Sequence, residues 1–193
     1  MSDADEISKI VSDIGLKFQA LEDLLKNSTK QDTTKLFIRF PRGFIRPVSY
    51  YKEKYSFVKQ RPLLDNISYC LQMTDIFRWI MNRFDIDLSA KEMIIKHGII
   101  CTSSAIEAMI WYLVSAECNL KPAKRFSKNI AKMQGKKVLS DKLLEEIDSF
   151  RKMRDHVHLN KLNHKENRKY AFKDYNMGIL ILHKIKNEIE SPF

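Results

Sequence analysis

The stretch from Ile99 to Val114 is apolar on nearly every side of a helix, and it limits the possible folds more than any other feature. It lies within a longer helical pattern, at about residues 90–118, which ends before Pro122. A helix that is apolar all round must be covered on all sides by other elements. The sequence therefore predicts a central helix surrounded by other helices.

Five further segments show helical patterns. Apolar residues at spacings of three and four mark residues 5–27, 63–84, 126–133, 140–159 and 170–190. Glycine and proline number only five each, which leaves little material for a turn-rich β-fold. We predict an all-α protein, an up-and-down bundle of four to five helices with an N-terminal helix and a partly extended arm. Residues 1–61 would hold the N-terminal helix and the arm, and residues 62–193 the bundle.

The arm, residues 35–60, differs from the helical segments. Pro41, Gly43 and Pro47 argue against a continuous helix and favour a short extended segment or a hairpin. Arginines interleave with aromatic residues here, a pattern that suits base stacking combined with phosphate contacts. The candidate RNA contacts in this arm are Arg39, Arg42 and Arg46. The other interpretation is an arm whose aromatic side chains pack onto the helical body or onto a partner subunit.

The chain carries a formal net charge of +10, which attracts polyanions and makes RNA a candidate partner. Lys136 and Lys137 follow Gly135 in a basic turn and are further candidate RNA contacts. Lysine-rich proteins also carry such a charge for solubility alone. The charge therefore favours RNA binding without establishing it.

Cysteine usage and the N-terminus indicate a cytoplasmic protein. Cys70, Cys101 and Cys118 are odd in number and lack Cys-x-x-Cys spacing, so we expect reduced thiols rather than disulfides or a zinc site. The acidic start, Met1 to Glu6, is unlike a signal peptide. No apolar run approaches the length of about 18 residues that a membrane span needs. We expect no metal, no cofactor and no membrane contact.

Basic residues, a carboxylate and histidines converge in one short helical stretch, Ser149 to Leu159. At about 100° per residue, one sector of the helix carries Arg151, Arg154, Asp155 and His158. His156 lies about 140° from Arg151, outside that sector, and about 160° from His158. The two histidines therefore cannot share a metal ion from one helix face.

Glu107 is the anomaly of the central helix. Its helical neighbours, Ser103, Trp111 and Val114, leave it few exposed directions. A buried carboxylate needs a partner, and an arginine on a facing helix is the expected one. The alternative is a Glu107 at the margin of the buried face, in contact with solvent.

Metal-independent cleavage of RNA suits this set of residues. A base removes the proton of the 2′-hydroxyl group, the oxygen attacks the adjacent phosphate, and an acid protonates the departing 5′-oxygen. Histidine, with a pKa near about 6.5, can take either role. Arginine binds the phosphate through two N–H groups and stabilises its growing negative charge. One histidine cannot fill both roles, so a two-fold dimer would supply the second.

Residues 62–190 resemble the HEPN superfamily of helical toxins, abortive-infection proteins and RNA-cleaving effectors. The family motif is an arginine, four to six residues, then a histidine, commonly with a polar residue after an arginine. Arg151 and His158 match the six-residue spacing, and Arg154-Asp155 supplies the arginine–polar pair, with aspartate where asparagine is more usual. Arg151 and His156 match the shorter spacing. The segment Ser103 to Ala108 is similar to the family's alanine-rich helix that carries a glutamate, here Glu107.

The resemblance implies an endoribonuclease whose bundle dimerises through the motif helices. Arg151 and His158 would be the catalytic pair in the dimer cleft, with Arg154, Asp155 and Glu107 beside them and His156 as the alternative histidine. A toxin or phage-defence effector is the expected role, and a regulatory or antitoxin protein is a candidate partner. The alternative is a non-catalytic helical module that binds RNA or nucleotides, or that oligomerises.

Overall fold

The computed structural model describes residues 3–27, 45–84, 86, 88–155 and 170–191. All regular secondary structure in these residues is helical, which confirms the prediction of an all-α fold. The helices are α1 (Asp3–Asn27), α3 (Val48–Lys54), α4 (Arg61–Arg83), α5 (Leu88–Ala116), α6 (Phe126–Met133), α7 (Asp141–Asp155) and α8 (Phe172–Glu190).

The chain forms two compact units, Met1–Pro41 and Arg42–Phe193. The boundary thus lies about twenty residues before the division at residue 61 that the sequence suggested. The reason is α3, which packs against α4 and contributes the buried Tyr51, while the turn after it contributes Tyr55 and Val58. The second half of the arm is therefore a short helix that belongs to the bundle. Arg39 and Arg42 lie outside the described residues.

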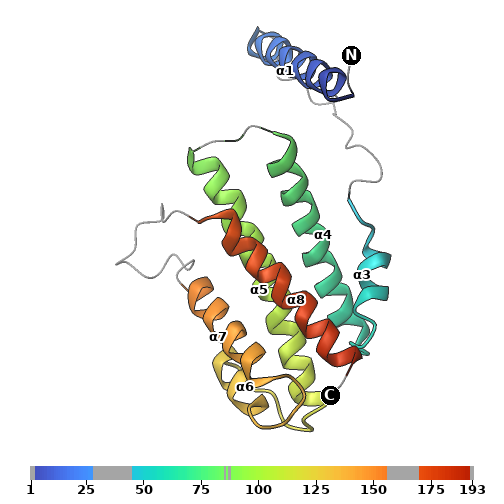
Figure 1. Ribbon diagram of the computed structural model, residues 1–193, viewed down its shortest axis with the longest axis vertical. Coiled ribbons are helices and arrows are strands. Elements are labelled where there is room, and N and C mark those ends of the chain that lie inside the picture. The colour runs from blue at the N-terminus through green and yellow to red at the C-terminus, as the bar shows by residue number, and fades with distance from the viewer. Residues whose placement is uncertain (1–2, 28–44, 85, 87, 156–169, 192–193) are drawn as a thin grey trace. The chain divides into compact units, whose positions relative to one another are not determined.

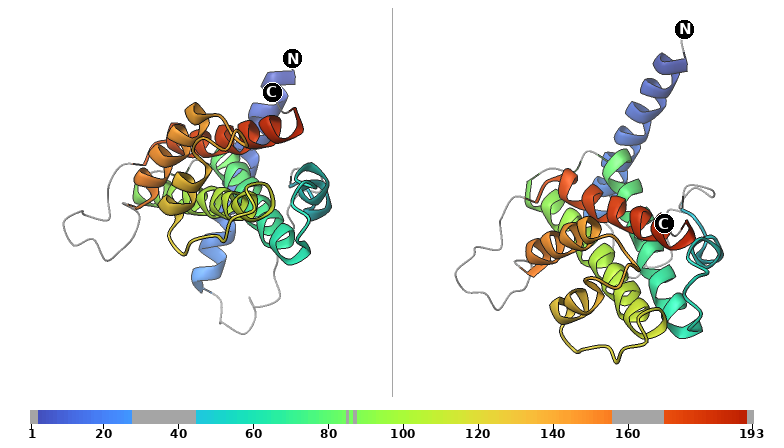
Figure 2. Two further views of the ribbon diagram at one scale, coloured as in Figure 1. Left: turned by 90° about the horizontal axis from the view of Figure 1, so that it is seen from below. Right: turned by 60° about the horizontal axis from the view of Figure 1, so that its bottom comes forward.

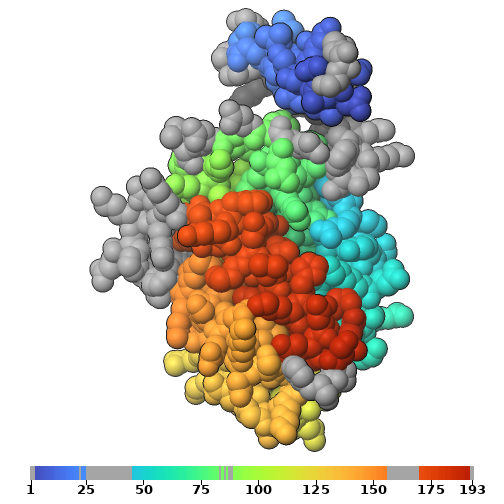
Figure 3. Space-filling view, viewed as in Figure 1, coloured from blue at the N-terminus to red at the C-terminus, as the bar shows by residue number. Residues whose placement is uncertain are grey.

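The long helices of the second unit run alternately up and down along the chain (Figure 1). They are α4, α5, α7 and α8, and the short α6 lies beside α5 and α7. α8 and α7 lie next to one another on one face of this unit (Figure 3). Pro62 stands in the first turn of α4, where its missing N–H costs no helical hydrogen bond.

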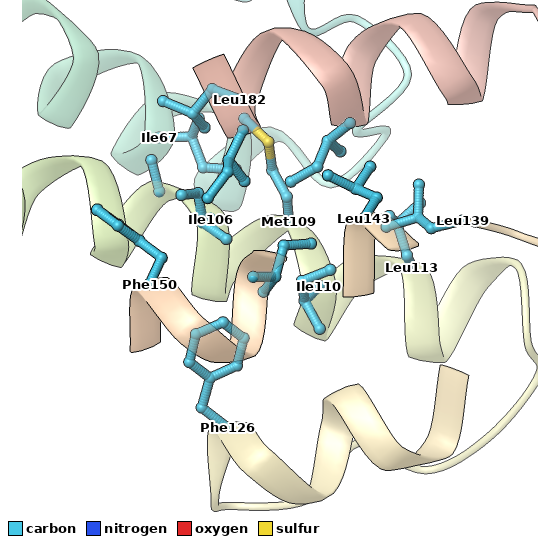
Figure 4. Close-up of a cluster of buried hydrophobic side chains, with 14 of the residues drawn as sticks. Ile67, Ile106, Met109, Ile110, Leu113, Phe126, Leu139, Leu143, Phe150 and Leu182 are labelled. Carbon is cyan, nitrogen blue, oxygen red and sulfur yellow. The ribbon is translucent and has the colours of Figure 1, made fainter. Parts of the chain in front are cut away.

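α5 is the central helix, as predicted. It packs against α4, α6, α7 and α8. Figure 4 shows Ile106, Met109 and Ile110 of α5 among apolar side chains of the neighbouring helices. These three residues and Leu113 have 0% exposure. The apolar surface of α5 thus supplies the core of the bundle.

Within the described residues, one helix, Ser89–Ala116, is long and apolar enough to cross a membrane. An 18-residue window of it has a mean hydropathy of 1.5, contrary to the expectation that no apolar run reaches this length. In the structure 56% of that window is buried. The core helix of a bundle passes the same test of length and composition, and α5 is such a helix.

Gly178 allows α8 to approach α5 and α7 closely. A Cβ atom at this position would lie 2.6 Å from Cζ of Phe150 and 2.7 Å from Oγ1 of Thr102. That Oγ1 donates a hydrogen bond to the carbonyl oxygen of Gly98 at 2.9 Å, so it is held in place. Phe150 is itself buried in the core and has little room to move.

We predict that Gly178→Ala lowers the free energy of unfolding by about 1–3 kcal/mol, because overpacking outweighs the gain in helix propensity. Gly15→Ala is the matched control, since no atom lies within 4 Å of the Cβ it would add. Urea denaturation of both variants measures the effect. A Gly178→Ala protein as stable as the wild type would contradict the close approach.

Candidate functional site

The candidate site lies at the C-terminal end of α7. Contacts with neighbouring helices hold α7 at both of its ends. At its start, Ser140 donates its backbone N–H and its hydroxyl group to the Glu188 carboxylate of α8, at 2.7 and 2.8 Å. The Ser140 Oγ also accepts the N–H of Leu143 at 3.2 Å. Farther along, an apolar stripe that ends at Phe150 is buried against the core. The polar residues of α7 therefore occupy the edge of a packed interface.

Two carboxylates hold the guanidinium group of Arg151. Its Nε donates to Oδ1 of Asp148 at 2.8 Å, and its Nη1 donates to Oδ2 of Asp155 at 2.6 Å. The Arg151 side chain is only 17% exposed. Hydrogen bonds from Lys152 and Arg151 hold the pKa of Asp148 below its ordinary value. Arg151 is thus fixed one turn before the end of the helix.

Glu107 of α5 pairs with Arg154 of α7, through Oε2 and Nη2 at 2.9 Å. An arginine on a facing helix was the predicted partner, and this prediction is confirmed. The Glu107 side chain is 37% exposed, so the carboxylate also lies at the margin of the buried face, as the alternative supposed. The pair joins the central helix to the motif helix.

Asp155 connects the two halves of the network. It accepts from Arg151, and its Oδ1 lies 3.8 Å from Nε of Arg154. The structure therefore brings together four of the predicted site residues: Arg151, Arg154, Asp155 and Glu107. His156 and His158 lie outside the described residues.

The sequence interpretation missed two members of the network, Asp148 and Lys152. Asp148 pairs with Lys152 at 2.8 Å as well as with Arg151. A signal was present, because Asp148 precedes Arg151 by three residues and Lys152 by four, the spacings at which helical side chains meet. With them, three cations face three carboxylates, so the described part of the network has no net formal charge.

A hollow of about 390 Å³ adjoins this network between α6 and α7. Its lining includes Ile130 and Leu144 from the apolar side and Asp148 and Lys152 from the polar side. Asp148 thus belongs both to the hollow and to the group that holds Arg151. A ligand in the hollow would lie beside the site.

Arg46, a predicted RNA contact, takes part in the packing of the bundle. Its guanidinium group pairs with Asp75 of α4 and lies 5.2 and 5.1 Å from the ring centroids of Tyr50 and Tyr51. Gln72 donates to the Arg46 carbonyl oxygen at 3.3 Å. These contacts agree with the interpretation in which the arm's aromatic side chains pack onto the helical body.

Lys136 and Lys137 are exposed in the turn after α6, as the sequence indicated. Lys137 has a φ of 57°, in the left-handed region. Cys70, Cys101 and Cys118 are half-buried thiols, and burial raises the pKa of each. Within the described ranges, no three His, Cys, Asp or Glu residues gather in a way that could hold a metal ion.

Comparison of the chain with protein-family models, with curated proteins and with solved structures found no match. The resemblance to the HEPN superfamily therefore depends on the motif residues and on the segment Ser103 to Ala108 alone, and it stays a prediction.

The Glu107–Arg154 pair should couple α5 to α7 energetically. In a double-mutant cycle of Glu107→Gln and Arg154→Gln, we expect a coupling of about 0.5–1 kcal/mol, the range for partly exposed ion pairs. Glu107→Gln combined with Arg125→Gln, an exposed arginine at the start of α6, is the control and should be additive. Additive effects in the first cycle would show that the Glu107–Arg154 pair contributes nothing measurable to the stability of the bundle.

Asp75 should make the bundle sensitive to acid. Burial raises the pKa of its carboxyl group, but the hydrogen bonds that Arg46 donates to it lower the pKa further, and the net pKa is below the ordinary value. Its stabilising effect is therefore fully present above the unfolded pKa, about 3.9, and is lost as the pH falls towards the lower folded pKa. We expect Asp75→Asn to lower the free energy of unfolding by about 1–3 kcal/mol at pH 7 and by progressively less below about pH 4.

Urea denaturation of wild type and Asp75→Asn between pH 3 and 7 measures this difference. Asp65→Asn, which breaks an exposed pair with Lys52, is the control and should cost less than about 1 kcal/mol. A cost of Asp75→Asn that stays constant down to pH 3 would contradict the assignment.

Proposed function

We propose that this chain is a metal-independent endoribonuclease of the HEPN type, acting as a toxin or phage-defence effector. The observation that carries the proposal is the pair of half-buried guanidinium groups, Arg151 and Arg154, held at the end of α7 by carboxylates from two helices. The sequence continues directly from this end into His156 and His158. Phosphate-binding and proton-transferring groups therefore stand within one short stretch.

Arg151 would bind the phosphate group of the RNA. A guanidinium group has five N–H donors, and Asp148 and Asp155 accept two of them. The remaining donors suit a phosphate oxygen, and the two carboxylates keep the guanidinium plane in a fixed orientation. Such preorganised donors stabilise the charge that develops on phosphate during cleavage.

His158 would transfer protons in the reaction, with His156 as the alternative. The base and the acid are separate roles, so two copies of the motif helix would be needed. We therefore include a homodimer through α7 in the proposal, with RNA as the substrate. The cytoplasm is the expected location of such an enzyme.

A non-catalytic helical module is the second candidate. It is favoured by the charge balance of the network, in which every cation, including Lys152, has a carboxylate partner. An incoming phosphate would have to share Arg151 with two carboxylates. Such a module would bind RNA or a nucleotide, or associate with other copies, without cleaving.

The test is the cleavage of a single-stranded RNA of mixed sequence in EDTA by purified protein. We expect Arg151→Ala and His158→Ala each to lower the rate by at least about 100-fold, since each removes a transition-state contact or a proton-transfer group. The products should carry 2′,3′-cyclic phosphate ends. A DNA strand of the same sequence should remain intact, because it lacks the attacking 2′-hydroxyl group.

Arg125→Ala removes an exposed arginine away from the network and is the matched control. It should retain wild-type activity, and His156→Ala should remain within a few-fold of it. Equal rates for His158→Ala and wild type would reject His158 as the catalytic histidine. Binding of the RNA without cleavage would favour the second candidate.

A further inference from the structure

The helix α1 exposes many large apolar side chains. Those with at least about one-third of their surface exposed are Ile7, Ile10, Val11, Ile14, Leu16, Phe18 and Leu24. Helices in proteins are stabilised mainly by packing of an apolar face, and a large exposed apolar face marks an interaction site.

The apolar positions of α1 follow a heptad repeat. Alternating steps of four and three residues join Ile7, Val11, Ile14, Phe18, Leu21 and Leu25. In heptad notation, Ile7, Ile14 and Leu21 occupy d positions, and Val11, Phe18 and Leu25 occupy a positions. Every a and d position from residue 7 to residue 25 is therefore apolar. Such a pattern is typical of the seam of a coiled coil, in which identical helices can pair.

We propose that α1 associates in parallel with α1 of another copy of this chain. In a parallel pair, a g position of one helix lies beside the following e position of the other. Lys17 occupies a g position and Glu22 the following e position, so opposite charges come together twice in each pair. An antiparallel pair would instead bring Lys17 beside the Lys17 position of its partner.

The charge of α1 favours another copy over a polyanion. The helix contains six acidic residues and three lysines, although the chain as a whole carries +10. RNA and anionic membrane surfaces are repelled by such a helix. Ile10 and Leu24 occupy g positions and widen the apolar face beside the seam.

Disulfide cross-linking of the full chain tests the arrangement. Ile7→Cys places a thiol at a d position, which meets the same position of a parallel partner, so oxidation should give a covalent dimer. Ser12→Cys, at an exposed b position, is the control and should form at least about 10-fold less covalent dimer than Ile7→Cys. The wild type, with its three half-buried cysteines, gives the background. Equal cross-linking of Ile7→Cys and Ser12→Cys would overturn the proposal.

Sedimentation equilibrium tests the seam with two matched variants. Ile14 occupies a d position and Leu16 an f position, and their side chains are 47% and 68% exposed. A lysine at either position therefore fits on the surface of the single helix. Ile14→Lys should weaken the association through α1 at least about 100-fold, because it buries charges in the seam. Leu16→Lys should stay within about 3-fold of wild type. A monomeric wild type, or equal effects of the two variants, would overturn the proposal.

These measurements are independent of ribonuclease activity and of any dimer through α7. Contacts between α7 helices would not produce a disulfide between Ile7→Cys chains. They would also not make Ile14→Lys weaken the association more than Leu16→Lys does. An inactive enzyme with a specific Ile7→Cys cross-link would thus reject the proposed function and support the association of α1.

Discussion

The bundle depends on the burial of α5. Its side chains at Ile106, Met109, Ile110 and Leu113 are fully buried, and four other helices cover it. Burial of apolar surface is the dominant favourable term in folding, and α5 supplies nine of the 27 buried apolar residues in the part of the chain that the structure describes. The places of α4, α7 and α8 follow from the need to cover this helix. Close approaches such as that of α8 at Gly178 are possible because a side chain is absent.

The candidate site depends on the same packing. The apolar stripe of α7 lies against the core, so the polar residues beside that stripe lie at the rim of the interface. There the side chains of Arg151 and Arg154 are only 17% and 18% exposed. Partial burial strengthens their bonds to carboxylates and limits their motion. The rim thus holds both arginines in ion pairs at the edge of the packed interface.

α1 presents the opposite situation. Several large apolar side chains along this helix are exposed, and its heptad repeat suits the proposed association with a second copy. An association through α1 would raise the local concentration of the second unit. A site that requires two copies of α7 would form more readily in such an assembly.

The sequence alone determined the helical class, the central position of α5 and the need of Glu107 for an arginine. These follow from periodicity and from the cost of burying a charge, both of which are local properties of the chain. It also placed Arg151, Arg154 and Asp155 on one sector, because the helix fixes their angles.

Only the tertiary structure decided which partners these residues have. Arg154 meets Glu107 across 47 positions of sequence, and Arg46 meets Asp75 across 29, because α5 and α4 pack where they do. Arg46 was a candidate RNA contact on the basis of its charge and aromatic neighbours, but a buried carboxylate on a packed helix accepts its hydrogen bonds. The local sequence pattern indicates which kind of partner a side chain requires. The packing of segments distant in the sequence determines which residue becomes that partner.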